Sequence, residues 1–168
     1  MSFSIYDASI PPMIRALQSL AKILDKAVAQ AAAEKIDLAT LLNARLAPDM
    51  LAFPSQIQIA SDAAKGCAAR LAGMEAPSWA DTETTFPELK ARIAKTIAFL
   101  ENVKAVQLAG AEDRKVTMKT PQTTLEFSGR DYLTQFALPN FFFHVTTAYG
   151  LLRHKGIKLG KMDYLGAN

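Results

Sequence analysis

Apolar residues recur at helical spacing along the start of the chain. The first such segment begins near Ser9, whose hydroxyl is placed to cap a helix ahead of two prolines, and it ends near Lys35. Its apolar stripe consists of Met13, Leu17, Leu20, Leu24, Ala27 and Ala31. Asp37 is placed to cap a short helix that continues towards Leu46, and Pro48 ends it.

Two further long helices are predicted before the pattern changes. The second starts at about Asp49 or at Pro54 and runs to Leu71, with a glycine two residues later as its stop. The third follows the segment 85–88, where a threonine and a glutamate three residues later form a capping box. Its apolar stripe continues to about Val103.

After the third long helix, the pattern of apolar residues changes from helical spacing to strict alternation with polar residues. Apolar and polar residues alternate over 116–119 and again over 124–127, and Thr120-Pro121-Gln122-Thr123 lies between them. Two short alternating runs around a turn predict a β-hairpin.

Ser128, with Asp131 three residues later, predicts the cap of a last long helix from about Arg130 to Lys155. The whole chain, residues 1–168, is therefore predicted to be a single, mainly α domain. The predicted fold is a four-helix bundle with a short β-hairpin between the third and fourth long helices.

The last helix is apolar on nearly all sides, which is typical of a helix buried in a bundle or shared with another subunit. A bundle of four does not easily cover three apolar faces of one helix. A homodimer formed through the last helix is the expected assembly.

Two polar residues interrupt one apolar stripe of this last helix. Asn140 and His144 are four residues apart, so they lie on the same side of the helix. A buried amide and imidazole need hydrogen-bond partners. Pro139, beside them, removes a backbone donor and is expected to open the helix locally.

The second long helix shows a similar pattern. If its period extends back to Pro48, one stripe places Asp49 and Gln56 inward among apolar residues such as Phe53. Two helices with inward polar residues predict a small polar pocket, lined by Asp49, Phe53, Gln56, Asn140, His144 and Tyr149. A purely structural interpretation stays open, because Asp49 also suits a helix cap and a core histidine is commonly just hydrogen-bonded.

Composition narrows the function classes. The net charge is +3 and the 19 lysines and arginines are scattered, whereas a nucleic-acid binder gathers them on one face. No signal peptide or membrane span is evident, and the single cysteine, Cys67, suits a cytoplasmic protein without disulfides. No phosphate loop, nucleophile elbow or paired-cysteine zinc pattern is present.

Several segments, most specifically from Phe127 onward, carry a resemblance to a known family. They are residues 5–7, 46–50, 127–133, 138–149, 152–154, 159–161 and 163–166. Together they resemble an uncharacterised bacterial family of unknown function within the DinB/YfiT-like superfamily of metalloenzymes. This resemblance implies a four-helix bundle, often dimeric. It also implies a metal held by three histidines, two of them at a His-x-x-x-His spacing on the last helix.

The chain departs from that ligand pattern. Asn140 and His144 stand where the histidine pair would be, and Asp49 is the counterpart of the remaining histidine. An amide oxygen is a poor ligand for zinc or nickel, so the pocket is expected without a metal. If a divalent metal such as zinc or nickel did bind, these three residues would hold it.

Three functions are consistent with these residues. The first is a small-molecule-binding or regulatory protein without a bound metal and without nucleic-acid or membrane partners. The second is an enzyme that uses His144 as a general acid or base, oriented by Asp49 or Asn140, on a thiol-bearing substrate. The resemblance implies this chemistry, with or without a metal, because some superfamily members transfer low-molecular-weight thiols or isomerise thiol adducts. The third is a structural dimer with no site.

Overall fold

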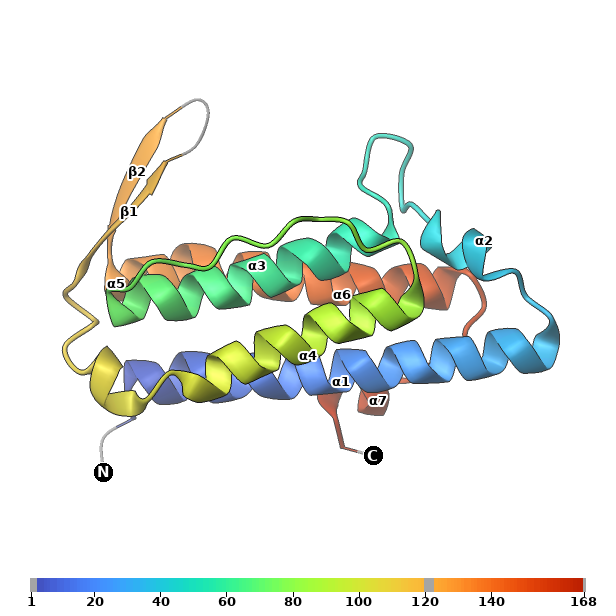
Figure 1. Cartoon of the computed structure of the whole chain (residues 1–168), viewed down its shortest axis with the longest axis horizontal. Coiled ribbons are helices and arrows are strands. Elements are labelled where there is room, and N and C mark those ends of the chain that lie inside the picture. Colours follow the sequence, from blue (N-terminus) through green and yellow to red (C-terminus); the bar gives the residue numbers. More distant parts are fainter. Residues whose placement is uncertain (1–2, 120–122, 168) are drawn as a thin grey trace.

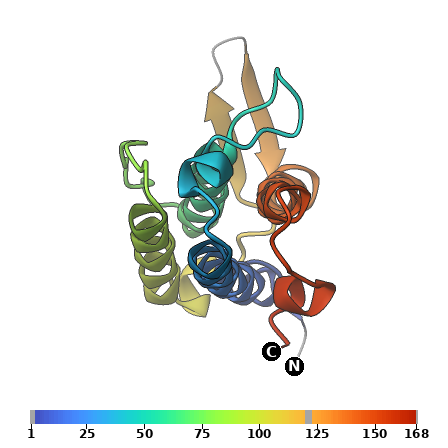
Figure 2. The same cartoon turned by 90° about the vertical axis from the view of Figure 1, so that its right-hand side faces the viewer.

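Four long helices form the body of the protein in the computed structural model, which describes residues 3–119 and 123–167 (Figure 1). They are α1 (Ile5–Glu34), α3 (Phe53–Ala72), α4 (Phe86–Asn102) and α6 (Leu138–His154). Seen end-on, they occupy four corners, and α3 lies between α4 and α6 (Figure 2). The predicted four-helix bundle is confirmed.

The first helix begins earlier than its sequence pattern predicts. Ser4 caps α1, and it forms a reciprocal capping box with Asp7. Ser9 is instead buried inside the helix, where its hydroxyl donates to the carbonyl of Ile5 at 2.6 Å. The two prolines, Pro11 and Pro12, therefore lie in the helix interior and not in its first turn.

The next boundaries follow local sequence signals. Asp37 caps α2 (Leu38–Leu42), and α3 begins at Phe53 with Pro54 in its first turn. Gly73 ends α3 with a φ of +68°, a conformation that glycine adopts without strain. The capping box predicted over 85–88 is present at the start of α4. A short 3₁₀ turn, η1 (Ala105–Leu108), follows it.

The β-hairpin is present where the alternating pattern predicts it. Strands β1 (Lys115–Lys119) and β2 (Thr124–Ser128) pair antiparallel, with Val116 opposite Phe127. The predicted turn residues Thr120, Pro121 and Gln122 lie outside the described residues. The strands rise from the end of the bundle at which α3 finishes (Figure 1).

The last long helix is not regular throughout. Ser128 caps it as predicted, and α5 (Gly129–Asp131) leads into η2 (Tyr132–Ala137), a π-helical segment. At its end the backbone N–H of Leu138 donates to the carbonyl of Leu133, five residues back. Pro139 follows directly and has no N–H to restore the regular pattern. The predicted local opening of the helix therefore lies just before Pro139.

One chain covers more of the last helix than its apolar pattern suggests. A final short helix, α7 (Lys161–Leu165), places Tyr164 edge-on against Tyr149, and the hairpin places Phe127 over Phe136. Among the described residues of α6, Phe143 is the large apolar side chain left most exposed, at 55%. The hairpin and α7, which lie outside the four long helices, therefore cover part of the last helix, and the dimer through this helix stays a prediction. Within the described residues, no helix is long and apolar enough to cross a membrane.

Candidate functional site

A hydrogen bond between α3 and α6 forms the centre of the candidate site. Gln56 is 2% exposed, and its Oε1 lies 2.8 Å from Nδ1 of His144. The amide Nε2 of Gln56 donates to the backbone carbonyl of Leu51 at 3.0 Å. The inward orientation predicted for Gln56 and His144 thus brings the two side chains together across the bundle.

This arrangement determines which nitrogen of His144 carries the proton. A carbonyl oxygen only accepts hydrogen bonds, so the contact with Leu51 requires the NH₂ group of Gln56 on that side. Its oxygen must then face the imidazole, and Nδ1 of His144 donates to it. In the neutral ring Nε2 is consequently left as a hydrogen-bond acceptor, and it forms no hydrogen bond to another group among the described residues.

Burial lowers the pKa of His144 below its ordinary value of 6.5, because the half-buried ring loses solvation of its charged form. The neutral form therefore predominates at neutral pH. Gln56 orients the ring without adding a negative charge, so it does not oppose this shift as an aspartate would. The site offers an oriented, uncharged nitrogen acceptor.

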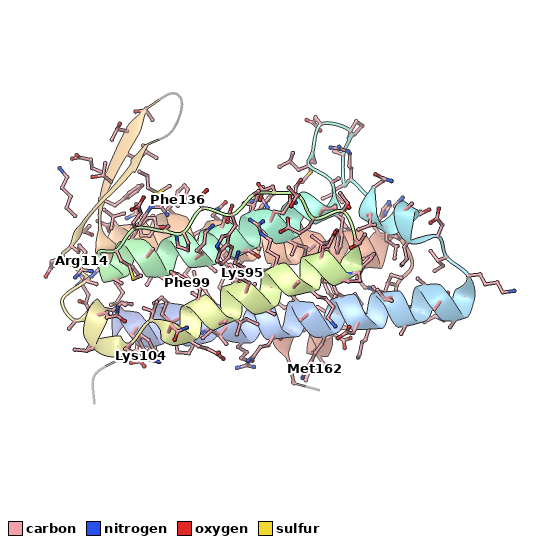
Figure 3. All side chains as sticks on the ribbon, in the orientation of Figure 1. Lys95, Phe99, Lys104, Arg114, Phe136 and Met162 are labelled. Atoms are coloured by element: carbon pink, nitrogen blue, oxygen red, sulfur yellow. The ribbon has the colours of Figure 1, made fainter. Side chains whose placement is uncertain are left out.

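Asn140 lies one helical turn before His144 and lines a cavity of about 210 Å³. The cavity lies where α3, η2, the start of α6 and strand β1 meet, and Phe136 marks it near the foot of the hairpin (Figure 3). Its lining residues are Ile59, Asp62, Ala63, Arg70, Met118, Tyr132, Phe136, Ala137 and Asn140. Asn140 is thus the one predicted site residue that lines this cavity, and His144 lies one helical turn after it on α6.

Three other predicted lining residues lie elsewhere. Asp49 is exposed in a turn, because α3 begins only at Phe53 and the helical stripe does not extend back to it. Phe53 is fully buried and packs against Phe86 at a ring distance of 5.7 Å, so it forms core. Tyr149 faces α7, where it contacts Tyr164.

The residues present do not fit a metal centre of the kind the superfamily implies. Asp49 is not on the helical stripe that was expected to aim it inward, and Asn140 offers only an amide oxygen. The Oε1 atom of Gln56 already accepts from His144. No group of three or more His, Cys, Asp or Glu side chains able to hold a metal ion exists in the described part of the chain. We therefore derive no metal-dependent step.

The sequence patterns did not identify Arg70 as a site residue. Its Nη1 donates to the hydroxyl of Tyr132 at 3.1 Å, and the guanidinium lies 5.7 Å from the centre of that ring. Burial raises the pKa of Tyr132 to about 12, so it remains a phenol. Burial likewise raises the pKa of the Cys67 thiol to about 12, in agreement with an inert core cysteine.

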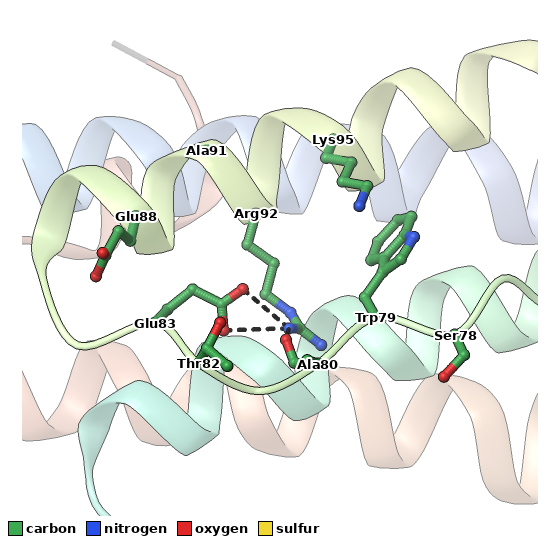
Figure 4. Close-up of a pocket in the computed structure, with 9 residues that line it drawn as sticks. All are labelled: Ser78, Trp79, Ala80, Thr82, Glu83, Glu88, Ala91, Arg92 and Lys95. Carbon is green, nitrogen blue, oxygen red and sulfur yellow. Dashed lines mark hydrogen bonds and ion pairs between the residues drawn. The ribbon is translucent and has the colours of Figure 1, made fainter.

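A second cavity, of about 490 Å³, lies between α4 and the connection before it, residues 74–84, which we call the strap (Figure 4). Its central residue is Arg92, whose side chain is 1% exposed and forms ion pairs with Asp62, Asp81 and Glu83. Trp79 of the strap lies against the ammonium groups of Lys65 and Lys95. These charges are already paired within the chain. The contacts of Arg92 and Trp79 therefore hold the strap against α4, and we assign them a structural role.

The helical bundle and its hairpin define a DinB-like helical protein. A crystal structure described as a DinB family member protein from Shewanella denitrificans is similar over 98% of this chain and 93% of that chain, with 41% sequence identity and a TM-score of 0.90. The profile of the domain of unknown function DUF1993 matches residues 5–165, and the chain belongs to that family. No curated protein matches it. The resemblance inferred from the sequence is confirmed.

Proposed function

We propose that this protein binds a small molecule at the site formed by His144 and Asn140, without a resident metal. One observation carries the proposal. The hydrogen bond from Nδ1 of His144 to Gln56 leaves Nε2 as a free acceptor, one helical turn from an amide that lines a cavity. A histidine that only served core packing would not need a nitrogen acceptor that is oriented and without a hydrogen-bond partner among the described residues, one helical turn from a residue that lines a cavity.

The site supports binding better than it supports turnover. A general base needs a proton acceptor of suitable pKa, and neutral His144 provides one. A nucleophile or an oxyanion site beside it is not apparent among the described residues: the one cysteine, Cys67, is buried with a raised pKa. We therefore place a binding or regulatory role first, and a thiol-dependent transferase or isomerase using His144 second. A cytoplasmic location, favoured by the single buried cysteine, is part of the same proposal.

The test is an NMR fragment screen with neutral amides, alcohols and carboxylic acids as probes. Fragments that bind should shift the imidazole signals of His144 and the side-chain amide of Asn140. They should lose most of their affinity in His144→Phe, which keeps an aromatic ring but removes the acceptor. The matched control is His154→Phe, the same substitution at an exposed position of the same helix.

Two results would contradict the proposal. One is a screen in which no fragment shifts either side chain. The other is a set of fragments that bind His144→Phe as well as the unmodified protein. In either case the third function, a dimer whose polar residues serve only its packing, would explain the hydrogen bond between Gln56 and His144.

A further inference from the structure

Arg70 is a half-buried cation without an anionic partner. Its guanidinium contacts the hydroxyl and ring of Tyr132, and it forms no ion pair with a carboxylate in the described ranges. By contrast, Arg92 on the neighbouring α4, which lines the cavity under the strap, contacts three carboxylates. A guanidinium that has lost part of its hydration and has no counter-ion favours an anion from outside the protein.

The position of this guanidinium depends on Gly66, one turn earlier on α3. A Cβ atom at residue 66 would lie 2.4 Å from Nη1 of Arg70, much closer than two such atoms can approach. The arginine therefore folds back along its own helix over a residue that has no side chain. Glycine is unfavourable in a helix interior, and here it leaves room for the guanidinium at the cavity.

The cavity provides the rest of a recognition site. Its walls are largely apolar, with Ile59, Ala63 and Phe136 among them, and Asn140 lines it from α6. Asp62 also lines it, but its carboxylate is already paired with Lys65 at 2.7 Å and with Arg92 at 3.0 Å. The free charge in the cavity is consequently the positive charge of Arg70.

We infer that this cavity binds a small carboxylic acid, with the carboxylate on Arg70, an apolar body against the walls and a polar group at Asn140. The inference rests on the proposed function and extends it, since it names the ligand class for the cavity that Asn140 lines. A planar guanidinium fork suits a carboxylate. A protein cavity of about 150 Å³ accommodates benzene, so about 210 Å³ suits one ring with two small substituents.

The test is a calorimetric titration with 4-hydroxybenzoate, which carries a carboxylate and a hydroxyl at opposite ends of one ring. We expect binding at millimolar concentration, weakened at least about tenfold for the uncharged analogue 4-hydroxybenzamide. Benzoate, which lacks the hydroxyl, should bind more weakly than 4-hydroxybenzoate, and Asn140→Ala should remove that difference. Phenyl phosphate binding more tightly than both acids would overturn the assignment to a carboxylate.

Two substitutions test the role of Arg70. Arg70→Met should weaken 4-hydroxybenzoate binding at least about tenfold. Gly66→Ala should do the same with the arginine still present, because the new methyl group displaces the guanidinium. Alanine favours the helix, so this variant should unfold at a temperature no lower than the unmodified protein. The matched control is Gly150→Ala on α6, where an added Cβ meets no atom within 4 Å, and it should leave binding unchanged.

The outcomes separate this inference from the proposed function. No binding of 4-hydroxybenzoate, or equal binding by Arg70→Met, overturns the carboxylate site. Fragments that still shift His144 would then leave the proposed function standing. Binding that depends on Arg70 and Gly66, in a protein whose His144 responds to no fragment, supports the carboxylate site and contradicts the proposed function.

Discussion

The side chain of Gln56 holds His144 in one tautomer, through a hydrogen bond of 2.8 Å between residues 88 positions apart. The other end of the same amide is bonded to Leu51, in the loop before α3. That loop is closed by a hydrogen bond from the N–H of Phe53 to the carbonyl of Ala44. The orientation of the histidine therefore depends on the conformation of a loop that does not itself contact the cavity beside Asn140.

Replacing Gln56 by glutamate tests this relationship directly. The new carboxylate would lie where the amide oxygen accepts from Nδ1, and a negative charge at that distance favours the imidazolium. We expect the pKa of His144 to rise in Gln56→Glu, measured by NMR titration of its ring protons. Gln135→Glu, at an exposed position of η2, is the charge control and should leave the pKa unchanged. An unmodified protein that is protonated on Nε2 at neutral pH would show that the tautomer is wrong.

The lowered pKa of His144 predicts how stability varies with pH. In the unfolded chain the imidazole titrates near 6.5, and in the folded protein it titrates below that value. Between the two values the unfolded state binds more protons, so the free energy of unfolding rises with pH through that window. The contribution approaches its full value as the pH rises past the unfolded pKa of 6.5, and it is lost as the pH falls towards the folded-state pKa.

Chemical denaturation at several pH values measures this effect. The difference in unfolding free energy between the unmodified protein and His144→Asn should grow as the pH rises from the folded-state pKa through the unfolded value of 6.5, and level off above it. Carboxylates with lowered pKa values, such as Glu88, titrate at lower pH and cancel in that difference. A difference that does not vary with pH would show that burial does not disfavour the imidazolium.

Sequence patterns predicted the elements whose signals are local. The capping pairs Thr85–Glu88 and Ser128–Asp131 each lie within one helical turn, and both are present in the structure. The start of α1 was misplaced because two prolines usually mark a first turn, whereas Ser4 and Asp7 form a more complete cap before them.

The site was only partly predictable, because some of its contacts join residues that are far apart in the sequence. Gln56 and His144 each interrupt an apolar stripe, and that interruption is visible in the sequence. Asp49 was placed on the same stripe only on the assumption that the helix extends back to it. The contact of Arg70 with Tyr132 joins residues 62 positions apart, and no periodic pattern records such a pair. The sequence feature nearest to a signal for Arg70 was Gly66, a glycine in a helix interior four residues before it.

The strap should detach from α4 when Arg92, the buried arginine of α4, is replaced. Arg92→Met leaves Asp62, Asp81 and Glu83 without their shared cation. Breaking a buried ion pair costs about 3–5 kcal/mol, and the partial exposure of two of these carboxylates places the expected loss near the lower end. Denaturant unfolding measures the loss, and Trp79 fluorescence reports detachment of the strap. The control is Lys90→Met, which removes an exposed ion pair to Asp25 and should lower the free energy of unfolding by less than about 1 kcal/mol. Equal losses of unfolding free energy in the two variants would contradict the role of Arg92 in holding the strap.

Gly129, the first residue of α5, should not tolerate a side chain. A Cβ atom there would lie 1.8 Å from the backbone carbonyl oxygen of Ala111, and a backbone atom cannot move aside as a flexible side chain can. We expect Gly129→Ala to lower the free energy of unfolding by about 1–3 kcal/mol or more, as measured in urea. Gly150→Ala is again the control, and it should be neutral or stabilising. An equally stable Gly129→Ala would mean that the segment around Ala111, between η1 and β1, can shift away from the helix start.

Association through the last helix would centre on Phe143. Its ring is 55% exposed on α6 and lies edge-on to His144, with ring centres 5.1 Å apart. Burying such a ring against a second copy is favourable by about 1.5–3 kcal/mol per protomer. We therefore expect light scattering at micromolar concentration to give twice the chain mass of 18.3 kDa, and Phe143→Ser to give the single mass.

The control for this measurement is Val106→Ser on η1, which removes an apolar side chain that is 79% exposed away from α6 and should leave the dimer intact. A single mass for the unmodified protein would remove the dimer prediction. A double mass that persists in Phe143→Ser would place the interface on another face. Because Phe143 contacts His144, a dimer formed here would also limit access to the imidazole. Phe143→Ser should then raise the affinity of fragments that shift His144, and unchanged affinity would show that the two surfaces are independent.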